Sequence, residues 1–174
     1  MRMLAVLVVL FAAACAAVPG KDPRARHLDA LFAQLRSAPD EATARRLEED
    51  IRSAWRRSDD PTVDAAMAQA IEEAGNHEYD RALAILDDVV GRAPRYAEGW
   101  NTRATLLFFM GRLDRSLADI ERTLALEPRH FGALAGRALI HIRRGERAQA
   151  AASIRAAMAI DPYLRERELL PGLE

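Results

Sequence analysis

One spacing constrains the fold of this chain more than any other feature, because landmark residues recur every 34 positions. The recurring residues are prolines, glycines and small side chains, which stop helices, close them or let them approach one another. Self-similarity at a period of this length indicates a stack of identical structural units. The recurring positions are Pro94, Pro128 and Pro162; Gly111 and Gly145; and Ala82, Ser116 and Ala150.

Residues 97–128 show the content of one unit, which is two apolar stripes at helical spacing separated by a glycine. The first stripe contains Trp100, Leu106 and Leu107. Its helix is predicted to stop at Gly111, because glycine readily takes the left-handed conformation that closes a helix. The second stripe, which predicts a second helix, consists of Leu113, Leu117, Ile120 and Leu124.

Small residues and a proline complete the unit. Ala104 and Ser116 fall where the two helices would cross, and larger side chains there would force the axes beyond the usual distance of about 8–10 Å. Pro128 ends the second helix because it disfavours helical geometry at Glu127. Neither helix can bury its stripe alone, so the units must stack to form a continuous core.

The order of large, small, glycine and proline positions resembles the tetratricopeptide repeat. This resemblance implies an all-α fold, a right-handed α-solenoid of stacked antiparallel helix pairs. Three repeats are predicted, at residues 63–96, 97–130 and 131–164. The first is the least regular, since Glu73 and His77 replace an apolar residue and a glycine. The predicted packing positions are Trp100, Ala104, Leu107, Gly111, Ser116, Pro128, Ala138, Gly145, Ala150 and Pro162.

Segments on both sides of the repeats are also predicted to be helical. Residues 21–60 are interpreted as a short linker, from Lys21 to Arg26, followed by a capping helical hairpin. Asp60 is the expected N-cap of the first repeat, with Pro61 at the first helical position. Residues 61–174 hold the repeats and a short final helix, from Tyr163 to Leu170. The apolar positions of the hairpin are Leu28, Leu31, Phe32, Leu35, Ala44, Leu47, Ile51, Ala54 and Trp55.

The first twenty residues carry one charge, an apolar run and then small residues, a pattern typical of a secretory signal. The apolar run ends at Val18, short of the ~20 residues that a membrane-spanning helix needs. Cys15 is the only cysteine, and two interpretations of it remain open. It is either the lipidated cysteine of a bacterial lipobox, or a signal residue removed by cleavage after Ala16. Both predict an exported bacterial protein, soluble in the periplasm or anchored to the outer membrane by lipid.

Composition and motifs argue against several functional classes. Basic and acidic residues nearly balance, at 25 and 26, which disfavours nucleic acid as the main partner. The four histidines have no partner at metal-ligand spacing, and the glycines are isolated turn markers rather than a phosphate-binding loop. No metal, cofactor or catalytic residues are therefore predicted, and an enzyme is the most distant hypothesis.

The resemblance implies binding of a peptide or a helix in the concave groove lined by the first helix of each repeat. A basic clamp for acidic chaperone tails would need Lys or Asn where Met67, Ile71 and Gly132 stand, so a chaperone-tail adaptor is disfavoured. The predicted groove residues are Met67, Ile71, Asn101, Thr105, Phe108, Phe109, Leu139 and Ile142.

Two phenylalanines exceed what the core of the first helix needs, and Phe109 is the favoured partner anchor. The leading hypothesis is an interaction scaffold of the bacterial envelope that binds another protein. The alternative is a structural, self-associating subunit whose groove is filled by its own N-terminal hairpin or by a second copy. In the lipoprotein interpretation, the membrane is contacted only through the lipid at Cys15.

Overall fold

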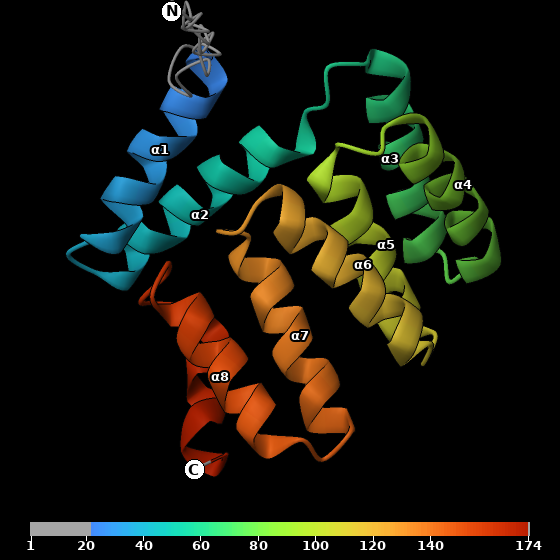
Figure 1. Cartoon of the computed structure of the whole chain (residues 1–174). Coiled ribbons are helices and arrows are strands. Elements are labelled where there is room, and N and C mark those ends of the chain that lie inside the picture. The colour runs from blue at the N-terminus through green and yellow to red at the C-terminus, as the bar shows by residue number, and fades with distance from the viewer. Residues whose placement is uncertain (1–21, 174) are drawn as a thin grey trace, which may run out of the picture.

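A computed structural model describes residues 22–173, so the predictions for the export signal and for Cys15 lie outside the described residues. The described part consists of eight α-helices and a C-terminal 3-10 helix, and it contains no strand (Figure 1). Its helices are α1 (Pro23–Arg36), α2 (Glu41–Arg56), α3 (Pro61–Gly75), α4 (Tyr79–Arg92), α5 (Ala97–Phe109), α6 (Leu113–Leu126), α7 (Phe131–Arg143), α8 (Arg147–Met158) and η1 (Arg165–Gly172). The prediction of an all-α solenoid of antiparallel helix pairs is confirmed for these residues.

Aspartate N-caps set the starts of the first three helices. The side chains of Asp22, Asp40 and Asp60 accept hydrogen bonds from backbone N–H groups in the first turn. Pro61 follows its cap as predicted. The predicted linker from Lys21 to Arg26 is wrong, because Asp22 caps a helix that already begins at Pro23.

The turns inside the three repeats share one backbone conformation. Gly111 and Gly145 both have φ of +73°, which confirms their predicted role as helix terminators. His77 occupies the equivalent place in the first repeat and has φ of 64°. A non-glycine residue in this region is strained, so the first turn is less favourable than the other two.

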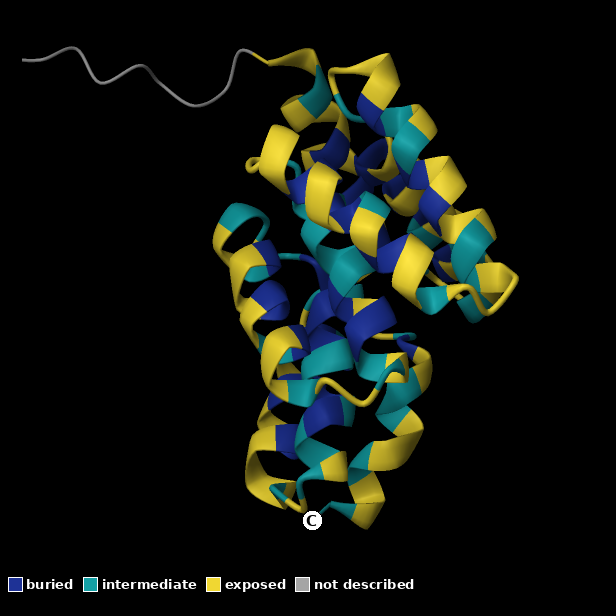
Figure 2. Ribbon diagram, turned by 90° about the vertical axis from the view of Figure 1, so that its right-hand side faces the viewer, coloured by how far each residue is buried: buried dark blue, intermediate teal, exposed yellow. Residues whose placement is uncertain are grey.

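Apolar clusters join each of the helix pairs α3/α4, α5/α6 and α7/α8 to a neighbouring element, and the buried residues of these helices are dark blue in Figure 2. Leu106 and Leu107 of α5 pack into the core of the first pair. Ile120 of α6 packs with Ile140 of α7. At the crossing of α5 and α6, the Ser116 hydroxyl donates to the Ala104 carbonyl oxygen at 2.7 Å, and both residues are buried. The equivalent Ala138 and Ala150 are fully buried in the last pair.

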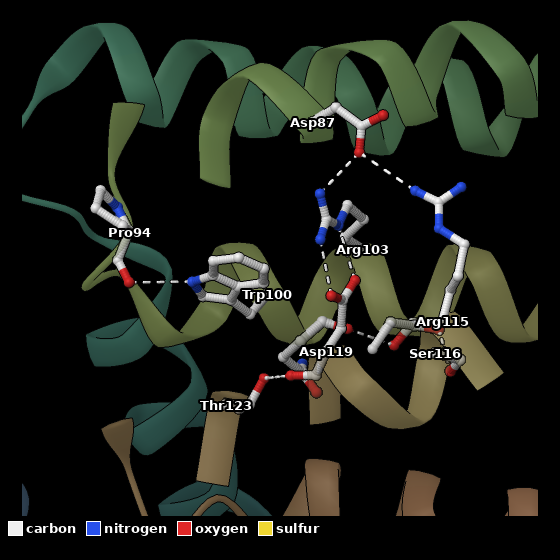
Figure 3. A network of polar contacts seen from close by, with 11 residues as sticks. Asp87, Pro94, Trp100, Arg103, Arg115, Ser116, Asp119 and Thr123 are labelled. Atoms are coloured by element: carbon white, nitrogen blue, oxygen red, sulfur yellow. Dashed lines mark hydrogen bonds and ion pairs between the residues drawn. The ribbon is translucent and has the colours of Figure 1, made fainter. Parts of the chain in front are cut away.

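An arginine links the second and the third helix pair to the pair before it, and Figure 3 shows the first of these two arginines, Arg103. Arg103 of α5 donates to both carboxylate oxygens of Asp119 in α6, at 2.7 and 2.8 Å, and to Asp87 of α4 at 2.8 Å. One period later, Arg137 donates to Ser153 and to Glu121, both at 3.2 Å. We call these two sets of contacts the arginine latches.

Trp100 lies outside the buried core, which differs from the prediction that it is a large core side chain. Its indole N–H donates to the Pro94 carbonyl oxygen at 3.2 Å, as Figure 3 shows, and the residue is half-buried. The guanidinium carbons of Arg103 and Arg122 lie 4.9 and 5.9 Å from its ring centroid. Trp100 therefore packs against long side chains at the surface, where a bulky ring fits because it does not have to enter the core.

The N-terminal hairpin, predicted to be a capping element, packs on the last helix pair rather than on the first. All nine predicted apolar positions of α1 and α2 are buried, but their cluster includes Phe131 and Leu134 of α7 and Leu164. The core of the first repeat contains no residue of α1 or α2 among its buried members. The hairpin therefore folds back over the last pair.

Helix α2 runs along the edge of the stack where the first helices of the pairs begin. It meets residues at the 34-residue spacing: the Tyr96 hydroxyl donates to the Arg56 carbonyl oxygen at 2.7 Å, and Trp55 stacks on His130 with centroids 4.0 Å apart. Leu164, one period further, is buried in the same cluster as α2. Burial raises the pKa of the Tyr96 phenol, which keeps it a hydrogen-bond donor. Helix α2 thus contacts the three segments that precede α5, α7 and η1.

The C-terminal segment also differs from the prediction. The final helix begins at Arg165 rather than Tyr163, because the Asp161 side chain accepts the Tyr163 N–H at 3.0 Å and holds residues 161–164 in a turn. Pro171 lies inside η1 instead of ending it. The segment packs on α8, and Arg167 forms an ion pair with Glu41 of α2 at 3.4 Å.

The carboxyl groups of Glu48 in α2 and Asp161 after α8 interact with each other. Asp161 is fully buried, and burial together with the negative charge of Glu48 raises its pKa to about 6. The folded state therefore holds this proton more tightly than the unfolded chain. The stability that results is complete below about pH 4 and is lost as the pH rises through about 6.

We expect Asp161→Asn to remove this loss, since asparagine cannot ionise and still accepts from Tyr163. At pH 7 the variant should be more stable than the wild type by on the order of 1–3 kcal/mol, and the difference should vanish near pH 4. Urea unfolding at a series of pH values measures it. A difference independent of pH would show that the Asp161 carboxyl is not protonated in the fold.

Leu107 is buried in the core and Trp100 packs at the surface of α5, so their replacement by alanine should lower the unfolding free energy by different amounts. Leu107→Ala removes a fully buried side chain and should cost about 2–5 kcal/mol of unfolding free energy. Trp100→Ala removes a half-buried ring and should cost roughly 1–2 kcal/mol. Urea unfolding compares them directly, and a larger cost for Trp100 would place its ring in the core.

Candidate partner-binding trough

The concave side of the stack contains two hollows on either side of α5. The α3–α5 hollow has a volume of about 450 Å³, and the α5–α7 hollow a volume of about 250 Å³. Both are lined by Asn101, Thr105 and Phe109, so they meet along one face of α5. We call the two hollows together the trough.

The α3–α5 hollow is apolar at its base and polar along one side. Its base includes Leu86 and Leu106, which are buried in the core of the first pair. Ile71 of α3 lines it and is 51% exposed. The polar side comes from α5, where Glu98 and Thr102 join Asn101 and Thr105. Apolar walls with a few polar groups are typical of binding pockets, and the volume lies within the ~300–1,000 Å³ usual for them.

The α5–α7 hollow is narrower because other elements border it. Leu139 and small residues of α7 form one wall, and Phe108 of α5 contributes to the other. Arg52 of α2 and Glu166 of η1 also line it. The hairpin therefore borders this hollow at its edge and leaves the α3–α5 hollow free, since no residue of α1 or α2 lines the latter.

The structure brings most of the predicted groove residues together. Ile71, Asn101, Thr105, Phe108, Phe109 and Leu139 all line the trough. Met67 does not, and its assignment to the groove is corrected: it is 4% exposed and packs into the core of the first pair. Ile142 is half-buried and lines neither hollow.

The two phenylalanines have different environments. Phe108 is half-buried, and the Arg143 guanidinium lies 4.0 Å from its ring centroid while donating to its carbonyl oxygen at 3.2 Å. Phe109 is 66% exposed and meets Phe108 edge to face, with ring centroids 5.9 Å apart. Phe108 is thus fixed between repeats, whereas Phe109 offers its ring to the trough.

A buried histidine at the edge of the trough was not predicted as a functional residue. His130 Nδ1 accepts the Ala133 N–H, which leaves Nε2 to donate to Glu98 at 3.0 Å. Trp55 of α2 stacks on the same ring. The chain therefore fixes the Glu98 carboxylate through groups on α2, α5 and α7. A histidine in the N-cap position before Phe131 was the sequence signal for this role.

Other kinds of site find no support among residues 22–173. No three His, Cys, Asp or Glu side chains gather there in a way that could hold a metal ion. In that range, no helix combines the length and apolar character needed to cross a membrane.

Comparison with known proteins found one close sequence relative and many similar folds. No protein-family model matches the chain. A TPR repeat-containing protein of Rhizobium etli is 45% identical over 118 residues, which cover 66% of this chain and 56% of the relative. The chain thus spans little more than half of that protein's length.

Solved structures of low sequence identity share the fold. The first TPR domain of Spaghetti (RPAP3), bound to an HSP90 peptide, has a TM-score of 0.62 at 14% identity, and covers 64% of this chain and 89% of that one. The TPR2B domain of yeast Sti1, in complex with an Hsp70 peptide, scores 0.58 at 21%, with coverage of 64% and 91%. MamA of Desulfovibrio magneticus scores 0.58 at 14%, with coverage of 88% and 85%.

Proposed function

The chain is a tetratricopeptide-repeat protein, and from this premise we propose that it is an interaction module that binds a peptide or helix of another protein in the trough. The observation that carries this proposal is the exposed ring of Phe109 where two apolar hollows meet. Aromatic side chains that border pockets are the residues that most often dominate binding energy at interfaces.

Solved structures of similar fold that contain bound peptides support a protein ligand, although they do not identify it. The TPR domains of Spaghetti and Sti1 hold chaperone peptides, one of which ends in the acidic sequence EEVD. In this chain the α3–α5 hollow has no lysine or arginine among its lining residues, and the α5–α7 hollow has only Arg52. An acidic tail would therefore lack the cations that it needs, which favours a different class of peptide.

We place this module in the bacterial envelope, on the strength of the signal-like residues 1–20. Two forms are proposed, a soluble periplasmic protein cleaved after Ala16 and an outer-membrane lipoprotein acylated at Cys15. In the second form the acyl chains would hold the trough close to the membrane.

Self-association is the second candidate function. The hairpin already covers an apolar surface of α7 within the same chain, which shows that the stack accepts helices along its edge. A second copy would have to use the α3–α5 hollow, because the hairpin does not reach it. Sedimentation at rising protein concentration distinguishes this candidate from a foreign partner.

The proposal predicts separable effects of the two phenylalanines. Phe109→Ser should change the unfolding free energy by less than about 0.5 kcal/mol, because the ring is exposed, while weakening capture of the envelope partner. Phe108→Ala should destabilise the fold, because it removes a ring packed under Arg143. Urea unfolding and a pull-down from envelope extracts measure both properties.

The same pair of measurements can refute the assignment. Loss of several kcal/mol in Phe109→Ser with capture unchanged would move Phe109 into the core and leave the trough without its anchor. Ala84→Ser, at an exposed position of α4 that lines neither hollow, serves as a control that should leave both properties unchanged.

The anchoring proposal has its own test. Cys15→Ser should abolish palmitate labelling and shift the protein from membranes to the soluble periplasm, because no acyl chain could then be attached. Identical soluble fractionation of both forms would establish cleavage after Ala16 instead.

A further inference from the structure

Charge is distributed unevenly along the stack. Residues 61–96, which hold the first helix pair, contain seven Asp and Glu side chains and three arginines. Residues 131–164, which hold the last pair, contain two Asp and Glu side chains and five arginines. The first helix pair is therefore acidic and the last pair basic.

The acidic first pair lines the wider, more apolar hollow. Glu98 is the only Asp, Glu, His, Lys or Arg among the residues lining the α3–α5 hollow. Glu72 and Glu78 are exposed and adjoin the lining residues Ile71 and Tyr79 in sequence. One carboxylate therefore lies in the lining and two exposed carboxylates follow or precede lining residues in the chain, which makes the surroundings of the hollow negatively charged.

The nearest arginines of this region are already engaged. Arg112, which follows the α5 turn, lies 3.7 Å from Asp80, and Arg81 lies 4.0 Å from Glu73. Arg103 is held by Asp119 and Asp87 on the other side of α5. Glu72 and Glu78 form none of the ion pairs found among residues 22–173, so their charge remains available to a ligand.

We propose that the partner segment is cationic: it places an aromatic or aliphatic side chain between Ile71 and Phe109 and carries Lys or Arg on both sides of that anchor. This inference rests on the proposed function and gives the ligand its chemistry. The anchor removes the exposed apolar surface from water, and the flanking cations are attracted by Glu98 in the lining and by the exposed Glu72 and Glu78 of the same helix pair. Carboxylates in the ligand would be repelled there.

The experiment uses a random peptide library displayed on phage and selected on the purified protein. A parallel selection on Phe109→Ser identifies the peptides whose binding needs the trough. Among those peptides, the proposal expects Lys and Arg to exceed Asp and Glu beside an aromatic or leucine. Binding of a selected synthetic peptide, measured by fluorescence anisotropy, should weaken as salt is raised, because exposed charges are screened.

Two double variants that remove the same charge test whether Glu72 and Glu78 attract the peptide. The double variant Glu72→Gln, Glu78→Gln should weaken binding of the selected peptide by about three- to tenfold at low salt. The control Asp50→Asn, Glu168→Gln removes the same charge from exposed positions on α2 and η1, and it should change binding by less than about twofold. Circular dichroism verifies that both variants keep their helices.

The outcomes test two claims separately: that the trough binds a partner, and that the bound segment is cationic. Peptides that depend on Phe109 and are rich in Lys and Arg support both the trough and its cationic ligand. Peptides that depend on Phe109 but are neutral or acidic overturn the cationic ligand and leave the proposed function standing. A library without any Phe109-dependent binder overturns the proposed function itself.

Discussion

An antiparallel helix pair of this length cannot cover its own apolar stripes, and the rest of the structure follows from that constraint. Each pair covers the next, so α5 buries Leu106 and Leu107 in the core of the first pair. The hairpin α1/α2 covers the last pair among residues 22–173. What stays uncovered is the concave side beside α5, where Ile71 and Phe109 remain exposed and the trough opens.

The arginine latches add direction to this stack. Arg103 and Arg137 each reach back to an acidic residue of the preceding pair, Asp87 and Glu121 respectively. The arginine latches do not recur one period earlier or one period later. Gln69 takes the place of the arginine in the first pair, and Arg155 stands where the last pair would carry the acid.

Periodicity allowed the helices, turns and most trough residues to be predicted, because spacing alone decides which face of a helix a residue occupies. Spacing could not separate Met67 from Ile71, which share a face of α3: packing against the first core buries one and leaves the other exposed. Nor could it place the hairpin. Its stripes required burial, but only the three-dimensional alignment of Tyr96, His130 and Leu164 offers α2 a continuous edge. Trp100 filled a core position of the pattern, yet Arg103 and Arg122 give its ring a place outside the core.

Site-specific photo-crosslinking in cells tests the binding trough most directly. A photoreactive phenylalanine analogue would replace Phe109 in one strain and Ala84, an exposed residue on α4 that lines neither hollow, in another. The account predicts a partner adduct of one defined mass from position 109 and none from position 84. Adducts from position 84 alone, or the same adducts from both positions, would contradict it.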